Sequence, residues 1–272
     1  MSNQTKTIGL LGCGWLGYQL ALSLRSKGFM VNGSTTRETK VATFSEASIR
    51  PFLIDFGRDE SQLKNFLEVD ILILGLPPSL KGVGEIYQDV LLRIGDIVSS
   101  LGPSRVLFIS STGVYGNNQG VVDELTDPMP DSIRGQNLLM AESLVKSWAV
   151  KTTILRFGGL VGEERHPVFS LHKKRSKKLG KGPINLIHRE DCIRIIQTII
   201  DFESWGELFN GVSPYHPFKD EYYNFVCDYF GLSHLEFVES EEGKKVDSVN
   251  LERKLKYKFV HRDLEPGLFK FL

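Results

Sequence analysis

The sequence has few cysteines and no long apolar run. Its three cysteines, Cys13, Cys192 and Cys227, are odd in number and far apart, which argues against a disulfide framework and a paired-cysteine metal site. No stretch approaches the roughly 18–20 apolar residues that a membrane helix needs. The N-terminal apolar run continues directly into a glycine-rich turn, unlike that of a signal peptide. We therefore expect a soluble, cytoplasmic protein.

An excess of charge of either sign is also missing. The 33 basic and 33 acidic residues cancel, so the whole chain has no electrostatic reason to favour nucleic acid or membrane. One local exception is the basic run 172–178, His-Lys-Lys-Arg-Ser-Lys-Lys. It is typical of a solvated helix face or loop, although it could also form a lid that meets a phosphate. The run lacks interleaved aromatic residues, which argues against nucleic acid as the partner. We expect a small-molecule substrate, with or without a phosphate.

Short apolar runs alternate with helical patterns along the first two thirds of the chain. The runs predict strands at 7–11, 29–33, 51–55, 70–75, 105–110, 152–156 and 207–212. Apolar spacing predicts helices at 15–27, 84–101, 137–148, 191–202 and 218–230. Strands that alternate with helices indicate an α/β fold with a doubly wound parallel sheet.

A glycine-rich turn follows the first expected strand and opens the first expected helix. It is a full G-x-G-x-x-G, formed by Gly12, Gly14 and Gly17 with Trp15 and Leu16 between the last two glycines. In this context the first glycine permits the turn, the second lets the backbone approach a pyrophosphate, and the third lets the helix pack on the strand. The helix N-terminus then offers N–H groups to the phosphates. The turn predicts a Rossmann-type dinucleotide site; the alternative is a glycine-rich turn without a ligand.

The residues after the second expected strand bear on the choice of cofactor. An NAD site usually has an acidic residue there to hold the ribose 2′-hydroxyl. This chain has Ser34, Thr35, Thr36 and Arg37 instead. Because arginine pairs with a phosphate, the pattern favours NADP over NAD. NAD stays open, since Arg37 could be a solvated loop charge.

These motifs divide the chain into two expected regions. Residues 1–160 form the dinucleotide-binding Rossmann core, and residues 187–213 return to it. Residues 161–186 and 214–272 form a smaller, C-terminal substrate-binding region, where glycine, proline and basic residues are frequent.

Several further segments resemble the extended short-chain dehydrogenases/reductases, the NAD-dependent epimerase/dehydratase family. Residues 108–116, FISSTGVYG, are similar to its signature strand end, and Ser111 takes the place of its active-site Ser/Thr. Residues 187–191, IHRED, resemble its xHxxD segment. Together the matches extend from residue 8 to about 212. The resemblance implies further cofactor contacts from Asp55, Gly75, Pro77 and Phe157.

One departure from that family concerns its catalytic Tyr-x-x-x-Lys pair. Aligning Ala141-Glu142 puts Arg134 at the tyrosine position and Leu138 at the lysine position. Leucine has no titratable group, and arginine stays protonated near neutral pH. The chain therefore resembles an atypical subgroup, a bacterial one with a GxGWLG start.

Other residues could replace the missing acid/base group. Tyr115 could act beside Ser111, but packing is the favoured interpretation. His166, in an Arg-His-Pro segment after the sixth expected strand, could be an acid/base near pH 7, contact an anionic substrate or cap a turn. For His188 and His216 we favour structural roles. No histidines and carboxylates share a metal-like spacing, so we expect no metal.

Three functions remain open at this stage. The first is an NADP-dependent reductase, epimerase or dehydratase-like enzyme acting on a small carbonyl or a nucleotide-linked sugar with non-standard acid/base residues. The second is a non-catalytic NAD(P)-binding sensor, and the third is a scaffold. The resemblance also implies a homodimer through helices 84–101 and 137–148, although their apolar stripes are needed to cover the sheet in any case.

Overall fold

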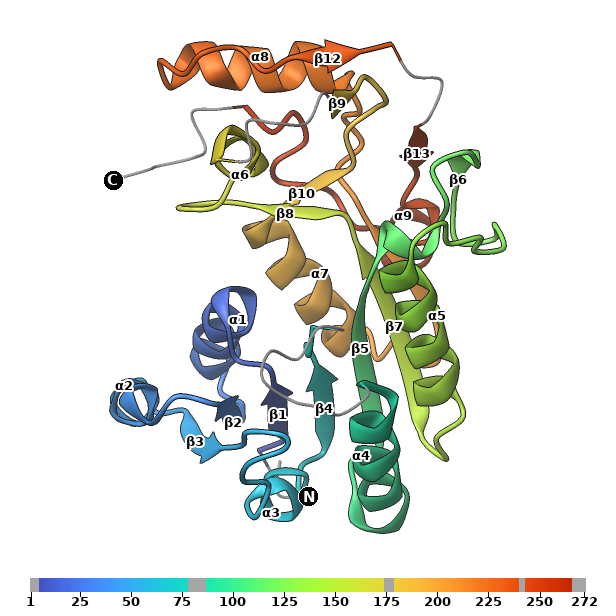
Figure 1. Ribbon diagram of the computed structural model, residues 1–272. Coiled ribbons are helices and arrows are strands. Elements are labelled where there is room, and N and C mark those ends of the chain that lie inside the picture. Colours follow the sequence, from blue (N-terminus) through green and yellow to red (C-terminus); the bar gives the residue numbers. More distant parts are fainter. Residues whose placement is uncertain (1–4, 78–86, 174–178, 240–242, 266–272) are drawn as a thin grey trace. The chain divides into compact units, whose positions relative to one another are not determined.

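The computed structural model describes residues 5–77, 87–173, 179–239 and 243–265 (Figure 1). The chain forms two compact units. Unit 1 comprises Met1–Ser110, Asn137–Leu155 and Ile199–Glu207, and unit 2 comprises Ser111–Gln136, Arg156–Thr198 and Leu208–Leu272. These units differ from the expected regions, because residues 111–136, 187–198 and 208–213 belong to unit 2, whereas the sequence predicted them in the Rossmann core. The assignment of cofactor and substrate roles to regions stays a prediction.

A seven-stranded sheet is the main β-structure, with strand order β11-β7-β5-β4-β1-β2-β3. Its pairs β1–β2, β2–β3, β1–β4 and β4–β5 are parallel. The chain winds outward from β1 in both directions, so the order reverses between β1 and β4, as in a doubly wound fold. The strands are β1 (Thr7–Leu11), β2 (Met30–Thr35), β3 (Arg50–Leu53), β4 (Ile71–Leu74), β5 (Arg105–Ser111), β7 (Lys151–Phe157) and β11 (Leu208–Gly211). This confirms the α/β, Rossmann-type fold predicted from the sequence.

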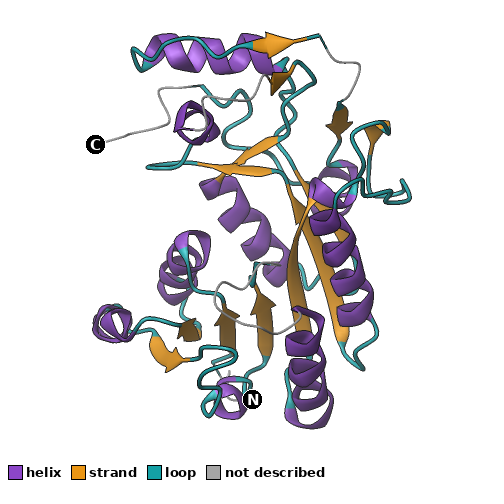
Figure 2. Cartoon of the chain, in the orientation of Figure 1, coloured by secondary structure: helices purple, strands orange, loops and turns teal. Residues whose placement is uncertain are grey.

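Helices alternate with these strands along the chain (Figure 2). They are α1 (Trp15–Ser26), α2 (Val41–Glu46), α3 (Leu63–Phe66), α4 (Tyr87–Leu101), α5 (Ile133–Lys146) and α7 (Arg189–Asp201), with short 3-10 turns η1 (Glu38–Lys40) and η2 (Thr112–Val114). Within unit 1, Figure 1 shows β1 between β2 and β4. All four residues of β4 are buried, as expected for a central parallel strand covered on both faces.

Unit 2 contains short strand pairs and three further helices. The pairs are β8 (Gly159–Val161) with β10 (Leu186–His188), β9 (Leu179–Gly180) with β12 (Phe237–Val238), and β6 (Gly120–Val122) with β13 (Lys244–Val246). The helices are α6 (Pro167–Lys173), α8 (Lys219–Tyr229) and α9 (Val249–Leu255). An apolar cluster packs α8 against β8, β10 and α6, and its members are Val161, Val168, Ile184, Leu186, Tyr222, Tyr223, Val226, Cys227 and Leu264.

The expected elements are found with small shifts at their ends. The largest described shift is in α5, which begins at Ile133 rather than at residue 137. Ser132 explains it, because its Oγ accepts a hydrogen bond from the Gly135 N–H at 3.1 Å and so caps the first turn. Residues 84–86 of the expected 84–101 helix lie outside the described residues. The two- and three-residue strands are too short to show a periodic pattern.

Within the described ranges, no helix has the length and apolarity needed to cross a membrane. The cytoplasmic location expected from the sequence stays a prediction.

Candidate functional site

The glycine turn between β1 and α1 is tightly packed at two of its three glycines. Gly12 has φ +103°, and a Cβ there would lie 2.6 Å from the Gly75 carbonyl oxygen. A Cβ on Gly17 would lie 2.6 Å from the Gly12 carbonyl oxygen. Any side chain at either position would therefore collide with backbone. These two glycines have the turn and packing roles expected from the sequence.

Gly14 differs from the other two glycines, because a Cβ there would meet no heavy atom within 4 Å. This residue immediately precedes α1, whose first residues are Trp15 and Leu16. The N–H groups of a helix's first turn have no intrahelical acceptor, and the helix dipole favours an anion there. Space over Gly14 next to such a helix end is the arrangement that a bound pyrophosphate requires. The residues present therefore fit a dinucleotide.

The end of β2 is joined to this turn by hydrogen bonds. The Gly12 N–H donates to Ser34 Oγ at 2.8 Å, so β2 helps to hold the turn. The Arg37 N–H donates to Thr35 Oγ1 at 3.1 Å, and the Arg37 side chain is exposed. No acidic side chain follows β2 until Glu38. Thr35 and Arg37 therefore present a hydroxyl and a cation at the position where a ribose 2′-group is recognised.

The other expected cofactor contacts of unit 1 lie in loops after neighbouring strands. Asp55 follows β3 and is half-buried, and its backbone N–H donates to the Asp59 carbonyl at 2.9 Å. Gly75 follows β4, and its N–H donates to the Leu11 carbonyl at 2.8 Å. Pro77 is the last residue described before the gap at 78–86. The cofactor roles of these three residues stay predictions.

Two adjacent serines at the end of β5 have different surroundings. In unit 1, Ser110 is buried and its Oγ donates to Glu142 Oε1 at 2.5 Å. In unit 2, Ser111 is half-buried, and its Oγ accepts from the Gly113 N–H at 3.2 Å. Ser111 is thus the more accessible hydroxyl, as a residue that contacts substrate must be. Local sequence patterns do not predict the contact between Ser110 and Glu142, because the two residues are 32 positions apart.

Tyr115 lies in the interior of unit 2 and is fully buried. Its hydroxyl is 2.8 Å from the Asp123 carbonyl oxygen and 3.1 Å from Asn210 Oδ1, and it accepts from Arg156 Nη1 at 2.8 Å. Burial raises the pKa of Tyr115, and nearby Arg156 opposes that rise. A hydroxyl held by three partners favours the packing interpretation over the catalytic one.

His166 is also buried and hydrogen-bonded. Its Nδ1 accepts from the Val168 N–H at 3.3 Å, and its Nε2 lies 3.2 Å from the Tyr222 hydroxyl. The Tyr222 hydroxyl donates to the Leu264 carbonyl at 3.0 Å. Burial lowers the pKa of His166 to about 4, so the ring is neutral near pH 7. These contacts favour a turn-capping role over acid/base catalysis.

The remaining residues discussed in the sequence analysis are Phe157, Arg134, Leu138 and the basic run 172–178. Phe157 is buried, and a Cβ on Gly211 would lie 2.5 Å from its ring, so it packs closely against β11. Arg134 and Leu138 both lie on α5, the first exposed and the second buried. Of the basic run 172–178, only His172 and Lys173 are described, at the end of α6; residues 174–178 lie outside the described residues.

Lys219 and Lys244 are two lysines of unit 2 that no sequence motif marks as functional. Burial lowers the pKa of Lys219 and of Lys244, and the charge of Lys219 lowers the pKa of Lys244 further, while Asp131 opposes that effect. Lys244 Nζ donates to the Tyr115 carbonyl. No hydrogen bond or ion pair is found for Lys219 Nζ among the described residues. The charges of Lys219 and Asp131 thus both act on Lys244, in opposite directions.

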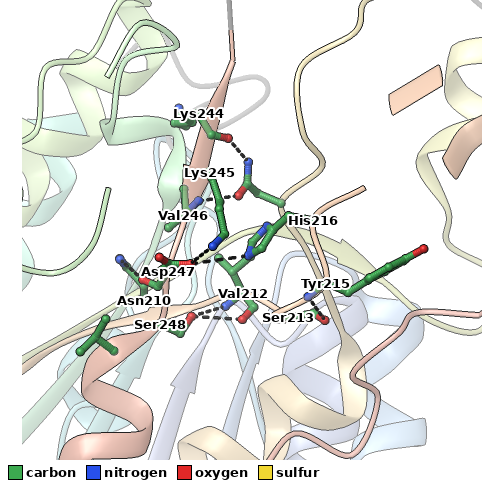
Figure 3. A network of polar contacts seen from close by, with 12 residues as sticks. Asn210, Val212, Ser213, Tyr215, His216, Lys244, Lys245, Val246, Asp247 and Ser248 are labelled. Atoms are coloured by element: carbon green, nitrogen blue, oxygen red, sulfur yellow. Dashed lines mark hydrogen bonds and ion pairs between the residues drawn. The ribbon is translucent and has the colours of Figure 1, made fainter. Parts of the chain in front are cut away.

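The strand that carries Lys244 is fixed by neighbouring polar contacts (Figure 3). The Asn185 amide donates to the Lys244 carbonyl at 2.7 Å and accepts from the Val246 N–H at 2.8 Å. Asp247, next along the chain, is 3.0 Å from Lys245 Nζ and 3.9 Å from His216 Nε2. His216 Nδ1 lies 3.0 Å from the Ile184 carbonyl oxygen, which supports its structural interpretation.

Comparisons with known proteins identify relatives by sequence and by fold. No family model matches the sequence. Protein YeeZ of Escherichia coli, from strains K12 and O157:H7, is 30% identical over 267 residues, covering 95% of this chain and 97% of the relative. A conserved protein of unknown function from Silicibacter pomeroyi DSS has a TM-score of 0.77 at 20% identity, covering 97% of each chain. UDP-glucuronic acid 4-epimerase from Bacillus cereus in complex with NAD has a TM-score of 0.74 at 18% identity, covering 93% of each chain.

The fold of this chain is similar to that of a solved epimerase that contains NAD. At 18% and 20% identity, the structural similarities show the fold alone. The sequence similarity extends over nearly the whole length of both proteins. This chain belongs to the family of protein YeeZ.

Proposed function

We propose that the chain binds a nicotinamide dinucleotide at the glycine turn, with NADP preferred over NAD. The observation that carries this proposal is the space over Gly14 at the start of α1, next to two glycines that backbone packing requires. The preference for NADP rests on Arg37, whose guanidinium can pair with a 2′-phosphate.

We further propose that the protein is an oxidoreductase or epimerase/dehydratase-like enzyme acting on a small carbonyl compound or a nucleotide sugar. The bound cofactor would supply hydride exchange. Ser111, the accessible hydroxyl after β5, would hydrogen-bond a substrate oxygen. The fold supports this class, because a solved neighbour acts on a UDP-sugar with NAD bound. With Arg134 and Leu138 aligned at the positions of the usual tyrosine and lysine, this enzyme would use non-standard acid/base residues.

Lys219 and Lys244 support a substrate that carries phosphate. Burial disfavours the charged form of each ammonium group, and the charge of Lys219 disfavours that of Lys244 further, so an anion bound near them would relieve these effects. A diphosphate or sugar phosphate offers the acceptor oxygens that such a pair would bind.

A second candidate function is non-catalytic: an NAD(P)-binding sensor or scaffold. Its support is Leu138, a buried residue that the sequence alignment puts at the position of the catalytic lysine of the epimerase/dehydratase family. This function needs the same cofactor site and predicts binding without turnover.

The decisive experiment is mass spectrometry of the small molecules that co-purify with the chain, followed by calorimetric titration with NADP and NAD. We expect a co-purified dinucleotide and tighter binding of NADP. A chain that carries no co-purified dinucleotide and also binds neither cofactor in the titration would overturn the dinucleotide proposal. A panel of carbonyl compounds and nucleotide sugars, assayed with the holoprotein and with Ser111→Ala, separates the two candidates. Turnover that Ser111→Ala abolishes supports the enzyme, and binding without turnover supports the sensor.

A further inference from the structure

Three side chains of unit 2, two from neighbouring positions and one from the C-terminal segment, meet at the start of α7. His188 ends β10, Glu190 lies in the first turn of α7, and His261 comes from the C-terminal segment. One ligand atom of each, two imidazole nitrogens and a carboxylate oxygen, lies within 4.8 Å of the other two. The imidazole rings of His188 and His261 have centroids 3.9 Å apart. Sequence spacing predicted no such cluster, because His261 is 71 residues from Glu190.

The present partners of these atoms are hydrogen bonds that a cation could replace. His261 Nε2 lies 2.8 Å from Glu190 Oε2, and the Glu190 N–H donates to His188 Nδ1 at 3.2 Å. The latter bond requires a lone pair on Nδ1, which belongs to a neutral imidazole. The donor set is thus two imidazoles and one carboxylate.

Surrounding contacts hold the donors in place. Asp191, fully buried, accepts from the backbone N–H groups of Val260 at 2.8 Å and His261 at 3.0 Å, and from the Tyr257 hydroxyl at 2.6 Å. The carboxylate of Asp191 thereby fixes the C-terminal segment against α7. Arg194 binds the other oxygen of Glu190, with Nε at 2.9 Å from Oε1. Such outer contacts orient ligands and contribute strongly to metal affinity.

We propose that His188, Glu190 and His261 form a three-ligand site for a borderline divalent cation, best matched by Zn²⁺. Two imidazoles and a carboxylate suit zinc better than they suit Mg²⁺ or Ca²⁺, which prefer sets made of oxygen atoms alone. The cation takes the place of the proton shared by His261 and Glu190, and a water molecule completes the coordination. Bound there, it links the C-terminal segment to the start of α7.

The test uses the untagged full-length chain and Zn²⁺ itself, in competition with a chromophoric zinc chelator. We expect one zinc per chain with a Kd below about 10 µM. His261→Gln and Glu190→Gln each keep a polar side chain. Each should weaken zinc binding by at least about tenfold, because the loss of a group that only orients a ligand already weakens metal binding by about 10- to 100-fold. The matched control is His234→Ala, which removes an exposed histidine that pairs with Asp228 at 2.7 Å but has no third ligand.

A second measurement needs no variant. Histidine ring ¹⁵N resonances of the wild-type chain, recorded with and without Zn²⁺, should shift for two histidines, and these should be His188 and His261. Zinc binding that is unchanged in His261→Gln and Glu190→Gln overturns the proposal. So does a wild-type chain that binds no zinc in this range, or shifts confined to other histidines.

Discussion

A Cβ on Gly12 would lie 2.6 Å from the carbonyl oxygen of Gly75, whereas one on Gly14 would meet no heavy atom within 4 Å. Two residues apart, one glycine is required by the fold and the other is left open to a ligand. The backbone of the Gly75 loop after β4 thus leaves no room for a side chain at Gly12, in the turn after β1.

Alanine at these two glycines should separate folding from cofactor binding. Gly12→Ala should lower the melting temperature substantially, because it adds a backbone clash at a positive φ. Gly14→Ala should lower it much less and still weaken cofactor binding by at least about tenfold, because its methyl group occupies the space for the pyrophosphate. Thermal unfolding and calorimetric titration measure the two effects. Equal destabilisation by both substitutions, or unchanged affinity in Gly14→Ala, would contradict this assignment.

Arg37→Ala should change the preference between cofactors. Loss of a charged hydrogen bond to the 2′-phosphate should weaken NADP binding by about 10- to 100-fold and leave NAD binding nearly unchanged. Lys64→Ala is a suitable control, because it removes an exposed cation of the same unit that lies on α3 and is not among the proposed cofactor contacts. A parallel loss for both cofactors would remove the basis for preferring NADP.

The neighbouring serines after β5 should respond differently to alanine. Ser110→Ala leaves the buried Glu142 carboxylate without its 2.5 Å hydroxyl donor, and it should reduce the free energy of unfolding by about 1–3 kcal/mol. Ser111→Ala removes an accessible hydroxyl and should reduce any turnover much more than stability. Urea unfolding and the substrate panel measure these effects. The reverse pattern would assign the substrate contact to Ser110.

Tyr115→Phe tests the packing interpretation directly. Loss of the hydroxyl removes one buried hydrogen bond from Arg156 and one from Asn210, so we expect a loss of about 1–3 kcal/mol in the free energy of unfolding. A variant as stable as the wild type that has lost all turnover would instead restore Tyr115 as an acid/base candidate.

His166 should make stability depend on pH below neutrality. Its pKa is about 4 in the folded protein and near 6.5 in the unfolded chain, so the unfolded state binds the extra proton between these values. This contribution to stability is fully present above about pH 6.5 and is lost as the pH falls toward 4. His166→Gln should therefore reduce the slope of unfolding free energy against pH by up to about 1.4 kcal/mol per pH unit in this window. His188 contributes in the same direction, so part of the slope should remain, and curves that run parallel would contradict the prediction.

Much of unit 1 could be predicted from local patterns. The apolar run 7–11, the glycine turn and the helix that follows are contiguous, and their residue types restrict the backbone directly. Gly28, with φ +90°, lies just after α1, as expected for a helix end. The short strands of unit 2, such as β9 and β12, carry too few residues for a period to be detected, so their pairing depends on tertiary contacts.

The sequence by itself determined the parallel α/β fold and the dinucleotide turn, because strand and helix periods and glycine φ preferences are local properties. Only the tertiary structure decided which polar side chains are buried and which meet. It placed Ser110 against Glu142, enclosed Tyr115 and His166, and brought His261 to His188 and Glu190. These contacts join residues tens of positions apart, and burial depends on the packing of every neighbouring element.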